Sequence, residues 1–375
     1  MSTHLIILKP INEVAKFLKS LIPANIPEAY SLNPMFANIA SDETIRNGIV
    51  AFRDFLCLVC DRLMVDGETY AKPPKKPSNM TDYPFLHNLT NLLVEMGYHG
   101  KLTPNGDSLL IAEMPLCIVT IDESGKKKSP KIPTSSQMAC LRFLSDCGFV
   151  FTGVDLKGKS LKISESQPLE VQYPDEPALL TGLKVLSIAD MELRTSRRYW
   201  NDHNLLRCDY RLIKADETDM IDVLKDFLHP LPQAVQDFAL KLHERYTDKG
   251  MICTLNILGD VNFSYAAISK SSKSLSSRQM YQRRVFEFSN SMRHGYCLFV
   301  RAKKADKYVD VIGKFAPYLQ EKIVAGYGCY RKLGRERCEG DCQGIRIPLD
   351  DLILDIGDDI IIWLNHEMPS SLKRK

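Results

Sequence analysis

The residues best suited to chemistry lie in one run near the C-terminal end of the chain, GYGCYRKLGRERCEGDCQGIRIPLDD, residues 326–351. Its glycines permit tight turns, and its three cysteines stand at the spacing C-x8-C-x3-C. Three thiolates on one tight loop can bind zinc when a fourth ligand, such as His294, Cys297 or His366, comes from elsewhere in the chain. The candidate metal ligands are Cys329, Cys338 and Cys342.

Packing is the competing interpretation of the same cysteines. Structural zinc sites usually contain two closely spaced pairs of ligands, whereas this run contains one such pair, Cys338 and Cys342. Cysteine is also a small side chain that is often buried. The sequence therefore favours packing and no cofactor, with zinc as the alternative.

Several motifs that mark well-known enzymes are absent from the chain. It has no Gly-x-Ser-x-Gly elbow, no dinucleotide-binding glycine fingerprint and no His-Glu-x-x-His motif. Its eight histidines show no metal-ligand spacing. A cysteine nucleophile stays open, because its partners would meet only in the folded chain. This pattern favours a binding protein over an enzyme.

Two other segments, 194–214 and 270–284, combine basic and aromatic side chains. Together such side chains can bind an anionic group and stack on a flat ligand such as a nucleobase. A basic helix end and a solvated hairpin loop are the alternative interpretations. The candidate residues for binding a ligand or nucleic acid are Arg194, Arg197, Arg198, Tyr199, Trp200, Arg207, Arg211, Lys273, Arg278, Tyr281, Arg283 and Arg284.

The composition is that of an ordinary soluble globular protein. The chain has 375 residues, of which 45% are hydrophobic and 25% charged, and its formal net charge is +3. So balanced a charge gives no global signature of polyanion binding. The N-terminal stretch lacks a signal-peptide pattern, no apolar run is long enough for a membrane span, and the eleven cysteines fit a reducing compartment. We therefore expect a cytoplasmic protein without a membrane partner.

The elements that must position these residues begin with two predicted helices. Residues 11–22 form a short amphipathic pattern. A longer apolar stripe runs to Leu63 and begins at Ser41 or Asp42, either of which suits a helix N-cap. The segment AKPPKKPS, residues 71–78, is rich in proline and indicates a linker.

Two later stretches repeat one pattern, in which a helix ended by glycine precedes a strand, a glycine turn and a second strand. They are LTNLLVEMGYHGKLTPNGDSLLI, residues 89–111, and LRFLSDCGFVFTGVDLKGKSLKI, residues 141–163. In the second stretch the expected return strand is Ser160–Ile163. A looser third copy begins at Phe238. Helix plus β-hairpin units at this spacing predict a duplicated, winged-helix-like α+β fold.

This organisation predicts three domains. They are an N-terminal helical domain with its linker over residues 1–78, a duplicated helix and β-hairpin domain over 79–215, and a C-terminal α+β domain with the cysteine-rich loop over 216–375. Within the last domain we expect strands at 286–288 and 296–302, and helices over 308–324 and 349–364.

A winged-helix unit reads DNA with a helix whose exposed face is usually rich in basic and amide side chains. The helices expected at 85–96 and 135–147 carry polar residues such as Asn91 and Gln137, but neither is basic. Nucleic-acid binding through these units is therefore an alternative hypothesis.

The C-terminal motif resembles that of an uncharacterised bacterial protein family. The resemblance rests on GYGC, the following C-x3-C-x-G and RIPLDD, together with CGFVFTGVDL, YPDEPALLTGLK, RCDYR and QDFALKLHERY. It covers roughly the last two-thirds of the chain, and Asp341 stands where members of the family often have glycine. It implies no activity, cofactor or partner.

The leading hypothesis is a non-enzymatic binding or regulatory protein, whose basic and aromatic surface contacts an anionic ligand or a protein partner. Nucleic-acid binding through the winged-helix-like units is one alternative. A zinc- or thiolate-dependent enzyme is the other.

Overall fold

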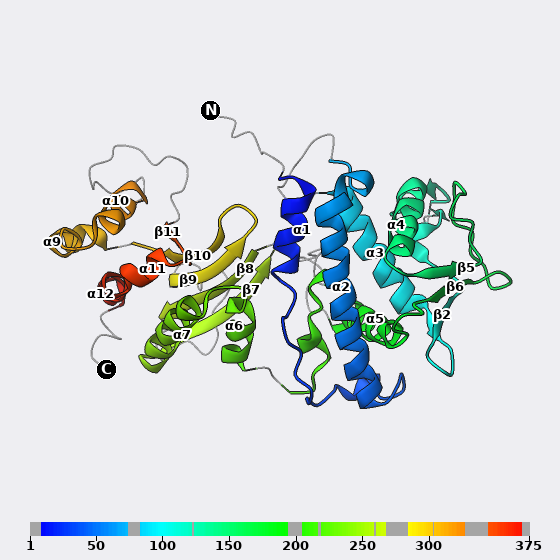
Figure 1. Ribbon diagram of the computed structural model, residues 1–375, viewed down its shortest axis with the longest axis horizontal. Helices are drawn as coiled ribbons and strands as arrows, with labels where there is room; N and C mark the ends of the chain where they lie inside the picture. Colours follow the sequence, from blue (N-terminus) through cyan, green and yellow to red (C-terminus); the bar gives the residue numbers. More distant parts are fainter. Residues whose placement is uncertain are drawn as a thin grey trace. The chain divides into compact units, whose positions relative to one another are not determined.

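A computed structural model divides the chain into two compact units, residues 1–218 and 219–375. Figure 1 traces the chain through both units. Each unit combines helices with an antiparallel sheet, which confirms the predicted α+β class. The structure describes residues 9–73, 83–121, 124–193, 205–216, 219–258, 260–267, 284–302, 304–326 and 344–369.

Helices dominate the first unit. They are α1 (Ile11–Lys19), α2 (Asp42–Tyr70), α3 (Pro84–His99), α4 (Thr134–Asp146) and α5 (Ala178–Ile188), the last extended by a π-helical turn (Ala189–Leu193). The smaller sheet has the order β1-β2-β6-β5 and consists of β1 (Lys101–Leu102), β2 (Ser108–Ile111), β5 (Val150–Thr152) and β6 (Leu169–Gln172). A separate ribbon pairs β3 (Thr120–Ile121) with β4 (Lys127–Lys128).

Helix α2 begins at the predicted N-cap, where the Ser41 hydroxyl accepts a hydrogen bond from the Thr44 backbone N–H (3.2 Å). It crosses α5 where both helices have glycine. A Cβ added to Gly48 would lie 2.7 Å from the carbonyl oxygen of Ala178 and 2.7 Å from the backbone nitrogen of Gly182. The backbones approach so closely that only glycine fits. Helix α2 lies before the predicted domain boundary at residue 78 and α5 lies after it, so the two helices pack on each other across that boundary. The boundary itself stays a prediction.

The repeated helix and hairpin is confirmed in its first copy, where α3 precedes the antiparallel pair β1 and β2. In the second copy α4 precedes β5, but the predicted strand at 160–163 is wrong. Strand β6 pairs instead with both β5 and β2. Burial explains the choice, because Leu169 and Val171 of β6 are 1% and 0% exposed. Leu161 and Ile163 keep partial exposure.

The second unit is built on the larger sheet, whose order is β11-β10-β9-β8-β7. Its strands are β7 (Met251–Leu258), β8 (Asp260–Ala267), β9 (Arg284–Ser291), β10 (Gly295–Val300) and β11 (Ile345–Pro348). Its helices are α6 (Met220–Leu228), α7 (Gln233–Asp248), α9 (Val309–Ile312), α10 (Pro317–Gly326), α11 (Leu352–Asp355) and α12 (Gly357–Glu367).

The sequence predictions for the second unit hold in outline. The third helix and hairpin copy is confirmed as α7, β7 and β8, and the strands expected around 286–288 and 296–302 are β9 and β10. Each of the two expected C-terminal helices is divided into two pieces. Pro317 begins the second piece of the first, because proline is compatible with a helix start and breaks a helix interior.

Aromatic side chains form the core on one face of the larger sheet. The ring of Phe286 stacks on that of Tyr265 at a centroid distance of 4.2 Å and meets the ring of Tyr246, on α7, at 5.3 Å. Trp363 of α12 is fully buried. One face of the sheet is thus an ordinary apolar core, so polar side chains in the same strands must point to the other face.

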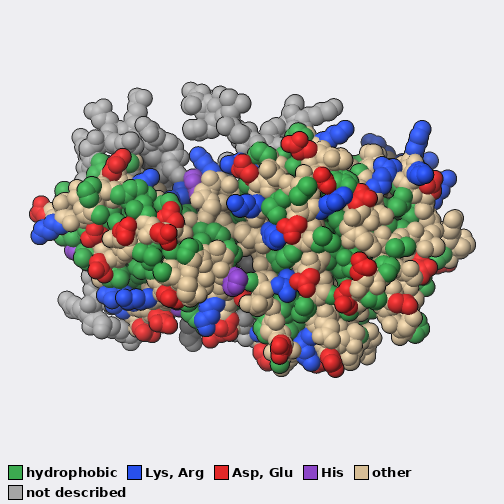
Figure 2. Space-filling view, viewed as in Figure 1, with side chains coloured by type: hydrophobic (Ala, Val, Ile, Leu, Met, Phe, Trp, Pro, Cys, Tyr) green, Lys and Arg blue, Asp and Glu red, His purple; other side chains and the backbone are tan. Residues whose placement is uncertain are grey.

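The face shown in Figure 2 has no dominant charge. Basic and acidic side chains are interspersed on the face shown in Figure 2, in line with the formal net charge of +3. Within the described ranges, every helix is too short or too polar to cross a membrane.

Candidate functional site

One row of residues crosses the larger sheet on the face opposite the aromatic core. Phe286 and Phe288 point into that core, so Glu287 between them points away from it. The residues directly opposed to it on the neighbouring strands share its face. We call the set the polar row, and from β7 to β11 its members are Thr254, Ser264, Glu287, Phe299 and Arg346.

A bulge in β9 brings Arg284 to the same face as Glu287. Tyr265 of β8 pairs with Phe286, and the next residue, Ala266, pairs with Arg284. One residue of β9, Val285, is therefore extra, and the alternation of side chains shifts by one position. Without this bulge, residues three apart would point to opposite faces of the strand.

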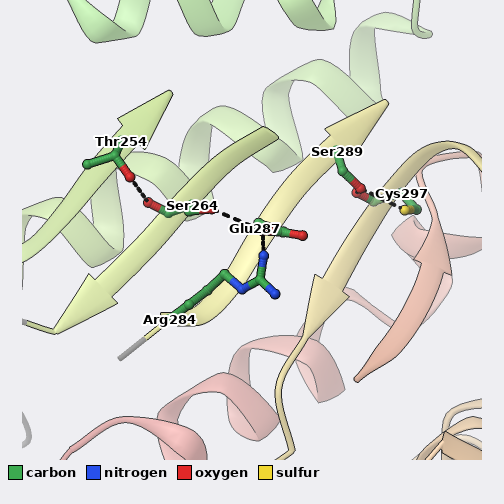
Figure 3. Close-up of polar contacts among 6 residues, drawn as sticks. All are labelled: Thr254, Ser264, Arg284, Glu287, Ser289 and Cys297. Atoms are coloured by element: carbon green, nitrogen blue, oxygen red, sulfur yellow. Dashed lines mark hydrogen bonds and ion pairs between the residues drawn. The ribbon is translucent and has the colours of Figure 1, made fainter. Parts of the chain in front are cut away.

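The charged pair at the centre of the polar row is buried. Arg284 is 9% exposed and Glu287 is 6% exposed, and the Arg284 guanidinium donates a hydrogen bond to Glu287 Oε2. The Ser264 hydroxyl donates a second bond to the same oxygen (3.0 Å), and the Thr254 hydroxyl donates to the Ser264 carbonyl (3.4 Å). Figure 3 shows these contacts in line across the strands. Glu287 Oε2 thus accepts hydrogen bonds from two neighbouring side chains.

Two arginines approach the ring of Phe299 from its two neighbouring strands. The Cζ atom of Arg284 lies 4.6 Å from the ring centroid, and that of Arg346 lies 5.1 Å from it. Both distances fall within the range of cation–π attraction. Among the described side chains of this cluster, the single carboxylate of Glu287 faces two guanidinium groups. The Phe299 ring is thus the apolar base on which both guanidinium groups lie.

Arg284 is the only member of the 270–284 candidate set within the described residues. The described chain resumes at Arg284 and again at Gly344, and both residues lie at the same end of the larger sheet. Val300, the last residue of β10, pairs with both Phe286 and Ile345, so Arg284 and Gly344 lie at that end. The candidates outside the described residues are Lys273, Arg278, Tyr281 and Arg283, with Cys329, Cys338 and Cys342.

Arg207 and Arg211, from the 194–214 candidate set, surround a carboxylate of their own segment. Arg211 Nε donates to Asp209 Oδ1 at 2.6 Å, and Arg207 is 6% exposed. Burial opposes ionisation of Asp209, but the charges of Arg211 and Arg207 hold its pKa below the ordinary value. These arginines thus have an internal electrostatic role. The other candidates of this set lie outside the described residues and are Arg194, Arg197, Arg198, Tyr199 and Trp200.

The three residues considered as a fourth zinc ligand lie in different places. His294 is exposed in the turn between β9 and β10, at the opposite end of the larger sheet from Gly344. The Cys297 sulfur is buried 3.0 Å from the Ser289 hydroxyl oxygen. The centroid of the His366 ring lies 4.8 Å from that of the Tyr308 ring. In the described part of the chain no three His, Cys, Asp or Glu side chains gather as metal ligands would.

Thiols in the described residues are placed for packing. Burial raises the pKa of Cys60, Cys117 and Cys147 to about 12. Burial also raises the pKa of Cys253, to about 11. A nucleophilic cysteine needs the opposite shift, toward a stable thiolate. These four thiols therefore lack the environment that activates a catalytic cysteine.

The helices considered for reading nucleic acid bury several of their polar side chains. On α3, Asn88, Asn91 and Glu95 are 6%, 5% and 3% exposed. On α4, Gln137 is 1% exposed and donates hydrogen bonds to the carbonyls of Cys117 and Ile132. These buried side chains cannot contact a nucleic acid, whereas Arg142 and Asp146 of α4 are exposed.

The prediction that the chain has no phosphate-binding loop motif is wrong at the level of sequence, because the pattern Gly-x-x-x-x-Gly-Lys-Ser fits residues 153–160 (GVDLKGKS). In a phosphate-binding loop the Lys and Ser begin a helix that follows the glycines. Here the segment follows β5 as a turn, with the Gly158 N–H donating to the Asp155 carbonyl (2.8 Å), and no helix begins at Lys159. The match therefore describes a hairpin turn.

The members of the site that sequence reasoning missed are Thr254, Ser264, Glu287, Phe299 and Arg346. A signal existed for two of them, because Phe-Glu-Phe and Ile-Arg-Ile each place one charge between two apolar residues of a strand. Comparison of the chain with protein-family models, with curated proteins and with solved structures gives no match. The function must therefore be argued from the geometry of the polar row.

Proposed function

We propose that this protein is a non-enzymatic, cytoplasmic binding protein, and that its polar row receives an anionic group of a ligand or of a protein partner. The observation that carries the proposal is the approach of Arg284 and Arg346 to one ring, that of Phe299, beside the carboxylate of Glu287. The cytoplasmic assignment rests on the cysteine content and on the free thiols among the described residues.

The chemistry of the cluster supports an anion as the ligand. A guanidinium presents several donors in one plane and remains charged at every physiological pH, so it binds carboxylate or phosphate oxygens well. Phe299 orients both guanidinium groups from below, and Glu287 fixes one of them through a hydrogen bond. Arg346 keeps partial exposure, so it is the arginine that a ligand reaches first.

Fluorescence polarisation tests this function with a fluorescein-labelled polyglutamate peptide and the full chain. We expect binding that weakens as salt is raised, because charged contacts are screened. No binding of the peptide at low salt would contradict the proposal.

Binding of labelled single-stranded and duplex DNA, measured across the same salt series, distinguishes the nucleic-acid alternative from the proposed function. Contacts to several phosphates give a steep logarithmic dependence on salt. Tight DNA binding with such a salt dependence, without binding of the polyglutamate peptide, would contradict the proposal and favour nucleic-acid binding as the function.

Metal analysis of the purified protein tests the zinc alternative, which depends on Cys329, Cys338 and Cys342. The proposed binding function requires no cofactor. One equivalent of zinc that is lost in Cys338→Ser would establish a metal site and reopen the question of catalysis.

A further inference from the structure

A groove of about 670 Å³ lies on the first unit, between one face of α2 and the segment that leads from β6 into α5. Its α2 residues include Val50, Asp54 and Leu58, which recur at the spacing of a single helix face. Tyr173 and Glu176 belong to the opposite side. The close crossing of α2 and α5 at their glycines holds the two sides together.

The floor of the groove is aromatic and apolar. The rings of Phe55 and Tyr173 meet edge to face at a centroid distance of 5.6 Å. Leu58 lies on α2 among the lining residues and is 44% exposed, so its side chain offers apolar surface to a ligand. An apolar floor of this kind favours contact with the hydrocarbon part of a ligand.

The rim of the groove is acidic. Asp54, Asp175 and Glu176 are exposed, and no lysine or arginine is among the lining residues. Asp54 forms an ion pair with Arg53 (2.9 Å), which leaves the charges of Asp175 and Glu176 to dominate the rim. The groove therefore complements a ligand that is positively charged at its end and apolar along its stem.

We infer that this groove docks a basic segment of a partner protein, with a lysine or arginine side chain as the anchor. The charged end would meet Asp175 and Glu176, and its hydrocarbon stem would lie against Val50 and Ala51, which keep partial exposure. An apolar neighbour in the same segment would cover Leu58. A free small amine fits less well, because small-molecule sites enclose most of their ligand, whereas this rim is exposed.

The experiment measures binding of a labelled basic peptide, GRALKALRG, to the full chain by fluorescence polarisation. The matched peptide GEALEALEG has the same length and apolar residues with the charges reversed. We expect the basic peptide to bind and the acidic peptide not to bind to the first unit. Because the polar row of the second unit can capture the acidic peptide, the decisive comparison uses variants of the groove.

Three variants decide whether the groove is the site. Asp175→Asn with Glu176→Gln removes the rim charges, and Leu58→Ser removes the exposed apolar contact. We expect the affinity for the basic peptide to fall about tenfold in the first and about threefold in the second. The control is Glu28→Gln with Glu165→Gln, which removes two exposed carboxylates elsewhere on the same unit and should leave the affinity within about twofold.

Three outcomes of this experiment would overturn the inference. The basic peptide failing to bind the wild-type chain would show that the groove is not a docking site for basic segments. Equal affinity of the wild-type and Asp175→Asn/Glu176→Gln proteins would place the binding elsewhere. An equal loss in the control variant would reduce the effect to non-specific attraction by negative charge.

Discussion

Arg284 and Glu287, three residues apart, form a buried ion pair within a single strand, because the bulge at Val285 of β9 turns both side chains to one face. Residues at this separation in a regular strand lie on opposite faces. The pair is therefore a product of the bulge and of the pairing of three strands. It fixes Arg284 over Phe299, where the proposed anion site is centred.

The ion pair is expected to show strong coupling in a double-mutant cycle. Glu287→Gln removes the charge of the carboxylate from a buried guanidinium and should lower the free energy of unfolding by about 3 kcal/mol. Arg284→Met should cost a similar amount, but the double variant should cost clearly less than the sum of the two. Urea denaturation measures all four proteins. Additive costs would mean that the two side chains do not stabilise each other.

The crossing of α2 and α5 predicts that Gly48→Ala is strongly destabilising. The new methyl group would meet backbone atoms of Ala178 and Gly182, which cannot rotate away, so we expect a loss of about 3 kcal/mol. Gly313→Ala is the control, because its Cβ would lie 3.6 Å from the nearest atom, an ordinary contact. Thermal unfolding compares the two. A Gly48→Ala protein as stable as Gly313→Ala would rule out a tight crossing.

Glu95 makes the stability of the first unit depend on pH. Burial raises its pKa above the ordinary value, although the Leu116 N–H donates to it (2.8 Å) and His99 and Lys131 oppose the shift. Because the folded pKa is the higher one, the folded chain holds a proton that the unfolded chain has released. The free energy of unfolding therefore falls as pH rises from about 4.3 through the folded pKa.

Glu95→Gln tests this pH dependence. Glutamine keeps an acceptor for the Leu116 N–H and has no charge to bury, so the variant should be more stable than the wild type near pH 7. The gain should vanish near pH 4, where the wild-type carboxyl is protonated in both states. Glu165→Gln is the control, since its side chain is exposed in the segment between β5 and β6. A gain that is the same at both pH values would show that ionisation of Glu95 is not its cause.

The buried thiols are expected to resist alkylation. With a pKa of about 12, Cys60, Cys117 and Cys147 are almost entirely protonated near pH 8 in the folded protein. Mass spectrometry after treatment with iodoacetamide should find these positions unlabelled in the native chain and fully labelled in urea. Labelling at equal rates in both conditions would contradict the packing role assigned to them.

Local patterns predict the elements well where one residue decides a local structure. Ser41 is the N-cap of α2 because its hydroxyl reaches a free N–H of the first turn. The alternation Phe286, Glu287, Phe288 predicts a strand with an apolar and a polar face. Such features depend only on neighbours in the sequence.

The polar row could not be predicted because it depends on register. Arg346 reaches Phe299 only after β11 pairs with β10, and Arg284 reaches it only through the bulge in β9. The role of Arg211 was equally hidden, since nothing in a basic and aromatic pattern shows that Asp209 will take its charge. Pairing over long distances in the sequence decides these contacts, and short patterns carry no information about it.

The most direct test of the proposed function compares two arginine variants of the larger sheet for binding of the polyglutamate peptide. Arg346→Met removes a guanidinium from the polar row and keeps an unbranched apolar stem. Arg293→Met removes the same group from the exposed turn between β9 and β10, at the far end of β10 from Val300. We expect Arg346→Met to weaken binding at least about tenfold and Arg293→Met to leave it within about twofold. Equal affinities of the two variants would contradict an anion site at the polar row.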